Sequence, residues 1–69
     1  MKTIRYQLID AEDKVIKPLL HLQIHAEDEY PDALMWGPRL FLFEHLMFVP
    51  GGPVCVYKET FPLHLHPML

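Results

Sequence analysis

Apolar and polar residues alternate in the N-terminal part of the chain, and this alternation predicts two β-strands. The apolar side chains of residues 3–10 (TIRYQLID) share one face at period two, and those in the second half of residues 15–27 do the same. Residues 11–14 between them are mostly polar, so we expect an antiparallel hairpin. A short helix that begins at Asp10 and stops at Pro18 is the competing interpretation.

Pro18 bears on where the second of these strands lies in the sheet. Proline has no backbone N–H to donate to a ladder of hydrogen bonds, so within sheets it occurs at edges or at bulges. We therefore predict an edge position or a bulge at Pro18.

The middle of the chain, residues 27–37 (EDEYPDALMWG), has a different pattern. Four acids lie between positions 27 and 32, and the apolar run that follows ends at Gly37-Pro38. Acids favour the N-terminal end of a helix, where the helix dipole is positive, and a Gly-Pro pair is typical of a helix stop. This pattern predicts one short helix.

Two apolar runs in residues 39–59 lie on either side of the sequence VPGGPV. Pro-Gly-Gly-Pro is a strong turn signal, and the valines and the tyrosine of the second run favour a strand. We therefore predict a second hairpin. The Leu, Phe and Met residues of the first run tolerate both states, so a helix over residues 38–49, with Pro38 at its first position, is the alternative.

These elements predict an α+β fold, a small antiparallel sheet of two hairpins with one short helix. The 69 residues are expected to form one domain, residues 1–69. A domain of this size is marginally stable without disulfides, a metal or oligomerisation. The chain has one cysteine, so no disulfide can form within it, yet 51% of its residues are hydrophobic. We therefore expect dimerisation to complete the fold.

The last nine residues, FPLHLHPML, alternate apolar and histidine side chains between two prolines. Proline resists helix and favours extended backbone, so residues 61–69 are predicted to form an extended C-terminal arm that adds to a sheet edge. The expected dimer interface combines this arm with phenylalanines of the first apolar run: Phe41, Phe43, Phe48, Phe61, Leu63 and Leu65.

The chain has five histidines, which is a high density for 69 residues, and histidine is a common metal ligand. His21 and His25 share one face of a helix or of a strand, and His64 and His66 share one strand face. Three or four imidazoles that converge would bind zinc, nickel or copper. Because no further ligand motif accompanies them, we interpret the four as polar-face residues and expect no cofactor. A four-histidine metal site is the alternative.

No residue pattern indicates catalysis. The chain has no serine, which excludes a serine nucleophile. Cys55 lies between two valines, so we expect a buried and unreactive thiol. The protein is therefore not expected to be an enzyme.

The charge and hydropathy patterns argue against two classes of partner. The net charge is −3, the isoelectric point is about 5.9, and the six basic residues are scattered, so no basic stripe exists for a nucleic-acid backbone. Apolar runs of four residues are too short to span a membrane, and the first residues lack the apolar segment of a signal peptide. We expect a cytoplasmic protein.

An acidic cluster beside aromatic residues can steer and anchor a protein partner. The residues expected to bind the partner are Glu27, Asp28, Glu29, Tyr30, Asp32, Met35 and Trp36. We expect a non-catalytic protein-binding module, a homodimeric inhibitor or adaptor that occupies a larger protein. Phage-type inhibitors of host regulators or defence proteins exemplify this class. A histidine-rich transition-metal-binding protein or a small metal-dependent enzyme is the alternative.

Overall fold

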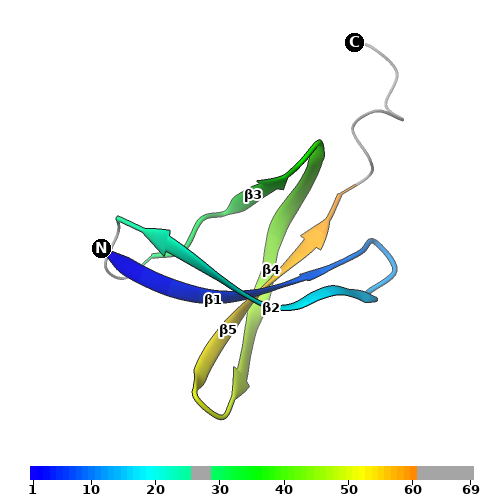
Figure 1. Cartoon of the computed structure of the whole chain (residues 1–69). Coiled ribbons are helices and arrows are strands. Elements are labelled where there is room, and N and C mark those ends of the chain that lie inside the picture. Colours follow the sequence, from blue (N-terminus) through cyan, green and yellow to red (C-terminus); the bar gives the residue numbers. More distant parts are fainter. Residues whose placement is uncertain (26–28, 61–69) are drawn as a thin grey trace.

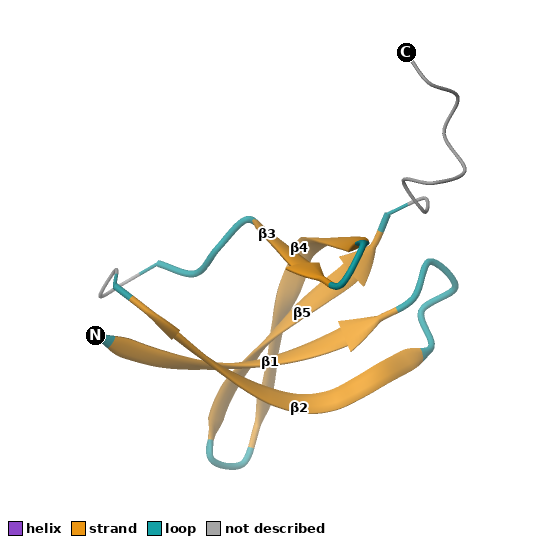
Figure 2. Ribbon diagram, turned by 45° about the horizontal axis from the view of Figure 1, so that its top comes forward, coloured by secondary structure: helices purple, strands orange, loops and turns teal. Residues whose placement is uncertain are grey.

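The computed structural model describes residues 1–25 and 29–60, which form one curled sheet of five strands (Figures 1 and 2). The strands are β1 (Lys2–Ile9), β2 (Val15–Ile24), β3 (Ala33–Trp36), β4 (Arg39–Val49) and β5 (Gly52–Glu59). Their order across the sheet is β2-β1-β5-β4-β3. Neighbouring strands are antiparallel, except that β1 and β5 run parallel. In Figure 1 the β1–β2 hairpin crosses the β4–β5 hairpin at a steep angle.

The predicted α+β fold is wrong, because the described part of the chain contains strands and no helix. Residues 27–37, predicted as a helix, include β3 instead. Gly37 and Pro38 form the two-residue loop between β3 and β4, and Gly37 has a φ of 62°. Glycine at positive φ followed by proline matches a type II′ turn, whose twist suits a hairpin. The Gly-Pro pair therefore forms a hairpin turn between two strands, whereas the sequence pattern predicted that it ends a helix.

The alternative of a helix over residues 38–49 is also wrong, because β4 occupies this region. β4 is paired on both sides, with β3 along one edge and with β5 along the other. Leu, Phe and Met do not favour either state strongly, so these two sets of hydrogen bonds decided the conformation. The register of β4 with β5 shifts between Phe43 and His45, which leaves Glu44 as the extra residue of a bulge.

Both predicted hairpins are confirmed as antiparallel pairs, but they belong to one mixed sheet. In the β1–β2 turn, the Asp10 carboxylate accepts hydrogen bonds from the backbone N–H groups of Glu12 and Lys14, at 2.8 and 2.9 Å. The hydrogen bond from Lys14 lowers the pKa of Asp10 below its usual value. Asp10 therefore closes a turn in the structure, where the competing interpretation placed a helix cap.

The prediction for Pro18 is confirmed on both counts. β2 is an edge strand of the sheet. Its register with β1 shifts between the Tyr6–Leu20 pair and the Leu8–Lys17 pair, which places Pro18 in the irregular stretch. The missing N–H of proline therefore costs no ladder hydrogen bond at this position.

β5 lies at the centre of the sheet, and residues 54–57 are buried on both of its faces. Cys55 and Tyr57 belong to the main core with Ile4, Leu8 and Phe41. Val54 and Val56 alternate with them and are buried on the opposite face. A continuous apolar run of this kind is typical of a central strand with a parallel neighbour.

Residues 29–32, which lead into β3, pack on the core through Tyr30 and Pro31. The Tyr57 hydroxyl donates a hydrogen bond of 2.6 Å to the backbone carbonyl of Pro31. The Tyr30 ring stacks on Phe43, with 4.3 Å between ring centroids. Burial raises the pKa of Tyr57, so this hydroxyl stays protonated and remains a donor.

Replacement of Tyr57 by phenylalanine is expected to lower the free energy of unfolding by about 1 kcal/mol, because it leaves the Pro31 carbonyl without its donor. Tyr6→Phe is the matched control. Tyr6 packs edge-on against Tyr57, and its hydroxyl has no hydrogen bond to any residue in the described ranges. Urea unfolding followed by circular dichroism measures both variants. Equal losses would show that the bond to Pro31 does not stabilise the fold.

Candidate functional site

The outward face of β3 and β4 carries an apolar surface, here called the outer patch, which consists of Ala33, Met35, Leu40 and Leu42. Ala33 lies opposite Leu42, and Met35 lies opposite Leu40, in the β3–β4 register. The alternating residues of the same strands, such as Leu34 and Phe41, point into the core. Met35 is 60% exposed and Leu42 is 45% exposed. The outer patch is therefore apolar surface that the described chain does not cover.

β3 forms one border of the outer patch and one edge of the sheet. Its pairing partner in the described chain is β4 alone, so no described strand pairs with the other side of its backbone. An unpaired edge strand presents a row of N–H and C=O groups to which another chain can add. The outer patch thus combines exposed apolar side chains with a backbone edge. Both features are typical of a site where another chain binds by adding a strand.

Trp36 lies on the inward face of β3, in a row of contacting side chains that crosses the sheet. This row, here called the side-chain ladder, consists of Lys17, Trp36, Arg39 and Glu59. The Nζ atom of Lys17, on β2, lies 5.2 Å from the Trp36 ring centroid, and the guanidinium of Arg39 lies 5.7 Å away. Arg39 in turn donates two hydrogen bonds to the Glu59 carboxylate, at 2.6 and 2.7 Å. The hydrogen bonds that Arg39 donates to the Glu59 carboxylate raise the pKa of Arg39. Trp36 therefore brings the edges β2 and β3 together, a role that the sequence pattern did not indicate.

The predicted partner-binding residues separate into three groups in the structure. Glu29, Asp32 and Met35 are exposed. Tyr30 and Trp36 each make a ring contact within the chain, although Trp36 stays 39% exposed. Two of the acids, Glu27 and Asp28, lie outside the described residues.

The residues predicted for the dimer interface also lie in different environments. Phe41 is completely buried in the core of its own chain, and Phe43 packs on Tyr57 in the same core. Phe48 is 79% exposed near the tip of the β4–β5 hairpin, opposite Pro53. The arm residues lie outside the described ranges: Phe61, Leu63 and Leu65. Of the three phenylalanines in β4, Phe48 alone has a side chain that is mostly available to a second copy.

His21 and His25 are exposed side chains on and just after β2, whereas His64 and His66 lie outside the described residues. Within residues 1–25 and 29–60, no group of three or more His, Cys, Asp or Glu side chains is placed to hold a metal ion. The four-histidine site thus stays an untested alternative.

Cys55 is buried, as predicted, and burial raises the pKa of its thiol. His45 lies across the β4–β5 hairpin from Val56, while Leu46 lies opposite Cys55. His45 would stabilise a Cys55 thiolate only if the two residues lay opposite each other, and the observed β4–β5 register does not pair them.

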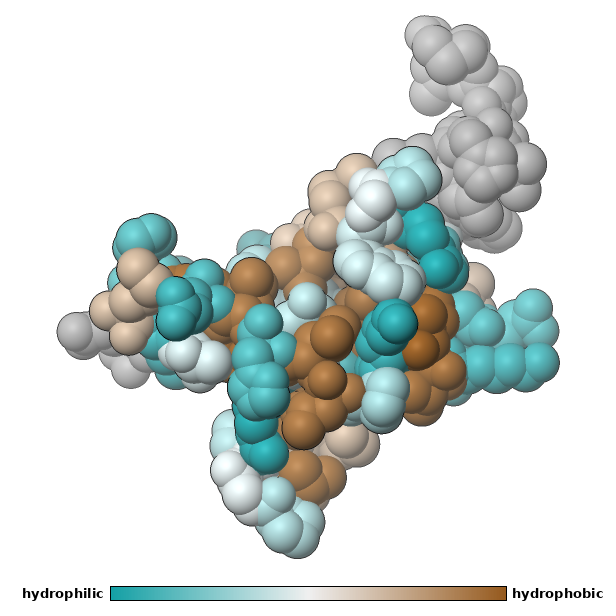
Figure 3. Space-filling model, in the orientation of Figure 1, coloured by the Kyte–Doolittle hydropathy of each residue, from teal (hydrophilic) through white to brown (hydrophobic). Residues whose placement is uncertain are grey.

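The space-filling view shows hydrophobic residues gathered across the middle of the visible face, with hydrophilic residues around them (Figure 3). No helix long and apolar enough to cross a membrane occurs in the described part of the chain. The comparisons with known proteins found no matching family model, no matching curated protein and no matching solved structure. The assignment of function therefore depends on the surfaces of this chain.

Proposed function

We propose that this protein is a non-catalytic protein-binding module that self-associates through the outer patch and occupies a larger partner protein. The observation that supports this proposal is the exposed pair Met35 and Leu42 beside the open edge of β3. In a twofold dimer the outer patches of the two copies pack face to face, with the edges of β3 alongside, so that Met35 and Leu42 of each copy are covered by the other. An inhibitor or adaptor role follows if the larger partner competes with the second copy for this edge.

The charges around the outer patch fit a protein partner. Asp32, directly before β3, is exposed, as is Glu29. Leu42 lies opposite Lys58, which forms a 2.9 Å salt bridge with Asp13. An apolar centre with charged residues at its rim is the usual anatomy of a protein–protein interface. The exposed acids favour a partner with a basic rim, because complementary charge speeds association.

Leu42→Glu tests the proposal. A carboxylate in the centre of the outer patch is expected to raise the dimer dissociation constant at least tenfold, because it must lose its water when the interface closes. Leu19→Glu is the matched control, because Leu19 on β2 is exposed to nearly the same extent, 46% against 45% for Leu42. The molar mass of each full-length variant is measured by size-exclusion chromatography with light scattering over a range of concentrations.

The wild type and Leu19→Glu should be dimeric at concentrations where Leu42→Glu is monomeric. A monomeric wild type at every concentration would refute self-association. If Leu19→Glu disrupted the dimer and Leu42→Glu retained it, the dimer interface would lie on β2 and not on the outer patch. The larger partner is sought with the same variants as bait, and a partner that Leu42→Glu still retains does not bind through the outer patch.

A further inference from the structure

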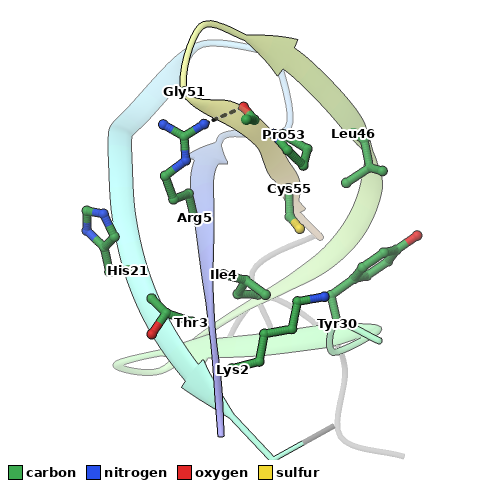
Figure 4. A pocket seen from close by; sticks show the side chains of 11 residues that line it. Lys2, Thr3, Ile4, Arg5, His21, Tyr30, Leu46, Gly51, Pro53 and Cys55 are labelled. Carbon is green, nitrogen blue, oxygen red and sulfur yellow. Dashed lines mark hydrogen bonds between the residues drawn. The ribbon is translucent and has the colours of Figure 1, made fainter. Parts of the chain in front are cut away.

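β1 and β5 diverge at one end and leave a hollow between them. Their parallel register begins at Tyr6 opposite Cys55, so the residues of β1 before Tyr6 have no described pairing with β5. The hollow, here called the β1–β5 pocket, has a volume of about 610 Å³ and is shown in Figure 4. Pockets of about 300–1,000 Å³ are the size that holds small molecules. The pocket lies at the β1 side of β5, whereas the outer patch lies on β3 and β4.

One wall of the β1–β5 pocket is apolar. Ile4 of β1 and Cys55 of β5 are buried side chains that line it, and Leu46 lines it from β4. Figure 4 shows Ile4 and Cys55 near the centre of the pocket and Tyr30 at its rim. This wall can take up the apolar body of a ligand.

Two cationic side chains line the β1–β5 pocket. Lys2 and Arg5 line it together with Thr3 and His21, and none of the Asp and Glu residues in the described ranges does, although the chain has nine acids and a net charge of −3. Neither Lys2 nor Arg5 forms a salt bridge with a carboxylate of the described residues. Burial raises the pKa of the Cys55 thiol, and the positive charge of Lys2 acts in the opposite direction. The pocket thus has positive charge that no described carboxylate neutralises.

Arg5 is held in place by the β4–β5 turn. Its guanidinium donates a hydrogen bond to the Gly52 carbonyl (Figure 4). Its Nη1 atom lies 3.1 Å from the position that a Cβ on Gly51 would occupy, so a larger residue at Gly51 would crowd it. A guanidinium has five N–H donors, and the bond to Gly52 uses one of them. The others remain for an anion, on a side chain that has already lost part of its freedom.

We propose that the β1–β5 pocket binds a small organic anion, with its anionic group on Arg5 and Lys2 and its apolar body against Ile4, Leu46 and Cys55. A charge-assisted pair with a guanidinium favours carboxylate, sulfonate or phosphate groups. The apolar wall selects anions that carry a ring or an alkyl chain over inorganic anions. This site is a small-molecule site in addition to the protein-binding surface, and it does not depend on dimerisation.

The first experiment titrates the full-length, ¹⁵N-labelled protein with three probes and follows the backbone amide signals by NMR. The probes are 2-naphthoate, its neutral analogue 2-naphthalenemethanol, and inorganic phosphate. We expect 2-naphthoate to shift the amides of residues 2–5 and 51–55, and both other probes to bind at least tenfold more weakly. Equal binding of the neutral analogue, or no shift in these residues up to the solubility of 2-naphthoate, would overturn the proposal.

The second experiment assigns the anion contact to its side chains. Arg5→Gln is expected to weaken 2-naphthoate binding at least tenfold, and Lys2→Gln severalfold. Lys14→Gln, an exposed residue in the β1–β2 turn that does not line the pocket, should bind as the wild type does. If Arg5→Gln fails to fold, Lys2→Gln decides the question, because Lys2 is exposed. Unchanged affinity in the folded variants would show that the cations do not bind the ligand.

Discussion

Replacement of Phe41 by alanine is expected to lower the free energy of unfolding by about 3–5 kcal/mol. Phe41 is completely buried, and its ring packs 6.5 Å from Trp36 and 5.5 Å from the Arg39 guanidinium, measured to ring centroids. Its removal deletes apolar contacts and leaves a cavity beside the side-chain ladder. A native state of this length has about 3–10 kcal/mol of stability in total, so Phe41→Ala should populate the unfolded state.

Phe48→Ala is the matched control for this prediction. It makes the same chemical change in the same strand, but the Phe48 side chain is 79% exposed. Its effect should stay within about 0.5 kcal/mol. Urea unfolding at low protein concentration, where self-association does not contribute, measures both variants. If the two variants lost equal stability, Phe41 would not be a core residue of the single chain.

The second large effect is expected at Gly52, the first residue of β5. Gly52 has a φ of 117°, a conformation that L-residues rarely adopt, and a Cβ there would lie 3.4 Å from the Arg5 guanidinium. Gly52→Ala is therefore expected to cost about 2–3 kcal/mol of stability through backbone strain. Because the Gly52 carbonyl accepts the hydrogen bond from Arg5, the same change should also weaken binding of 2-naphthoate in the β1–β5 pocket.

D-Alanine at position 52 separates strain from side-chain size. A D-residue adopts positive φ without steric cost, so this variant should lose less than about 1 kcal/mol. The chain can be assembled by native chemical ligation at Cys55, which is its one cysteine. Thermal and urea unfolding then compare glycine, L-alanine and D-alanine. Equal losses for the two alanines would show that the positive φ is not the cause.

Local pattern predicted those parts of the fold that depend on near neighbours in the chain. The alternation in residues 3–10 and in the second half of residues 15–27 predicted the β1–β2 hairpin, and Pro18 predicted its irregular edge strand. Pro50-Gly51 predicted the β4–β5 turn, where Gly51 has the positive φ, 95°, of the third position of a type II turn. Each signal acts within a few residues, because backbone torsions and turn geometry are local.

Only the tertiary structure decided whether residues 27–37 form a helix or contribute a strand. In residues 27–37 the acids and the Gly-Pro pair suited a helix, but the same Gly-Pro pair suits a type II′ hairpin turn. Pairing with β4 selected the second outcome, because it satisfies the backbone hydrogen bonds of residues 33–36 and buries Leu34 against Phe41. The sequence predicted Phe41 to lie in a dimer interface and gave no sign that it packs in the core of its own chain. Hydrophobicity does not distinguish a core within one chain from a core between two chains.

The sequence by itself therefore determined the strand character of its first and last described segments, the positions of its turns and an excess of apolar residues. The tertiary structure alone decided the parallel pairing of β1 with β5, the outer patch and the β1–β5 pocket. Arg5 and Gly52, which share a hydrogen bond, are 47 positions apart, and Lys17 and Trp36, which form the contact between the edges β2 and β3, are 19 apart. Contacts at such separations leave no periodic signal, because they depend on how the sheet curls and on which strands become neighbours.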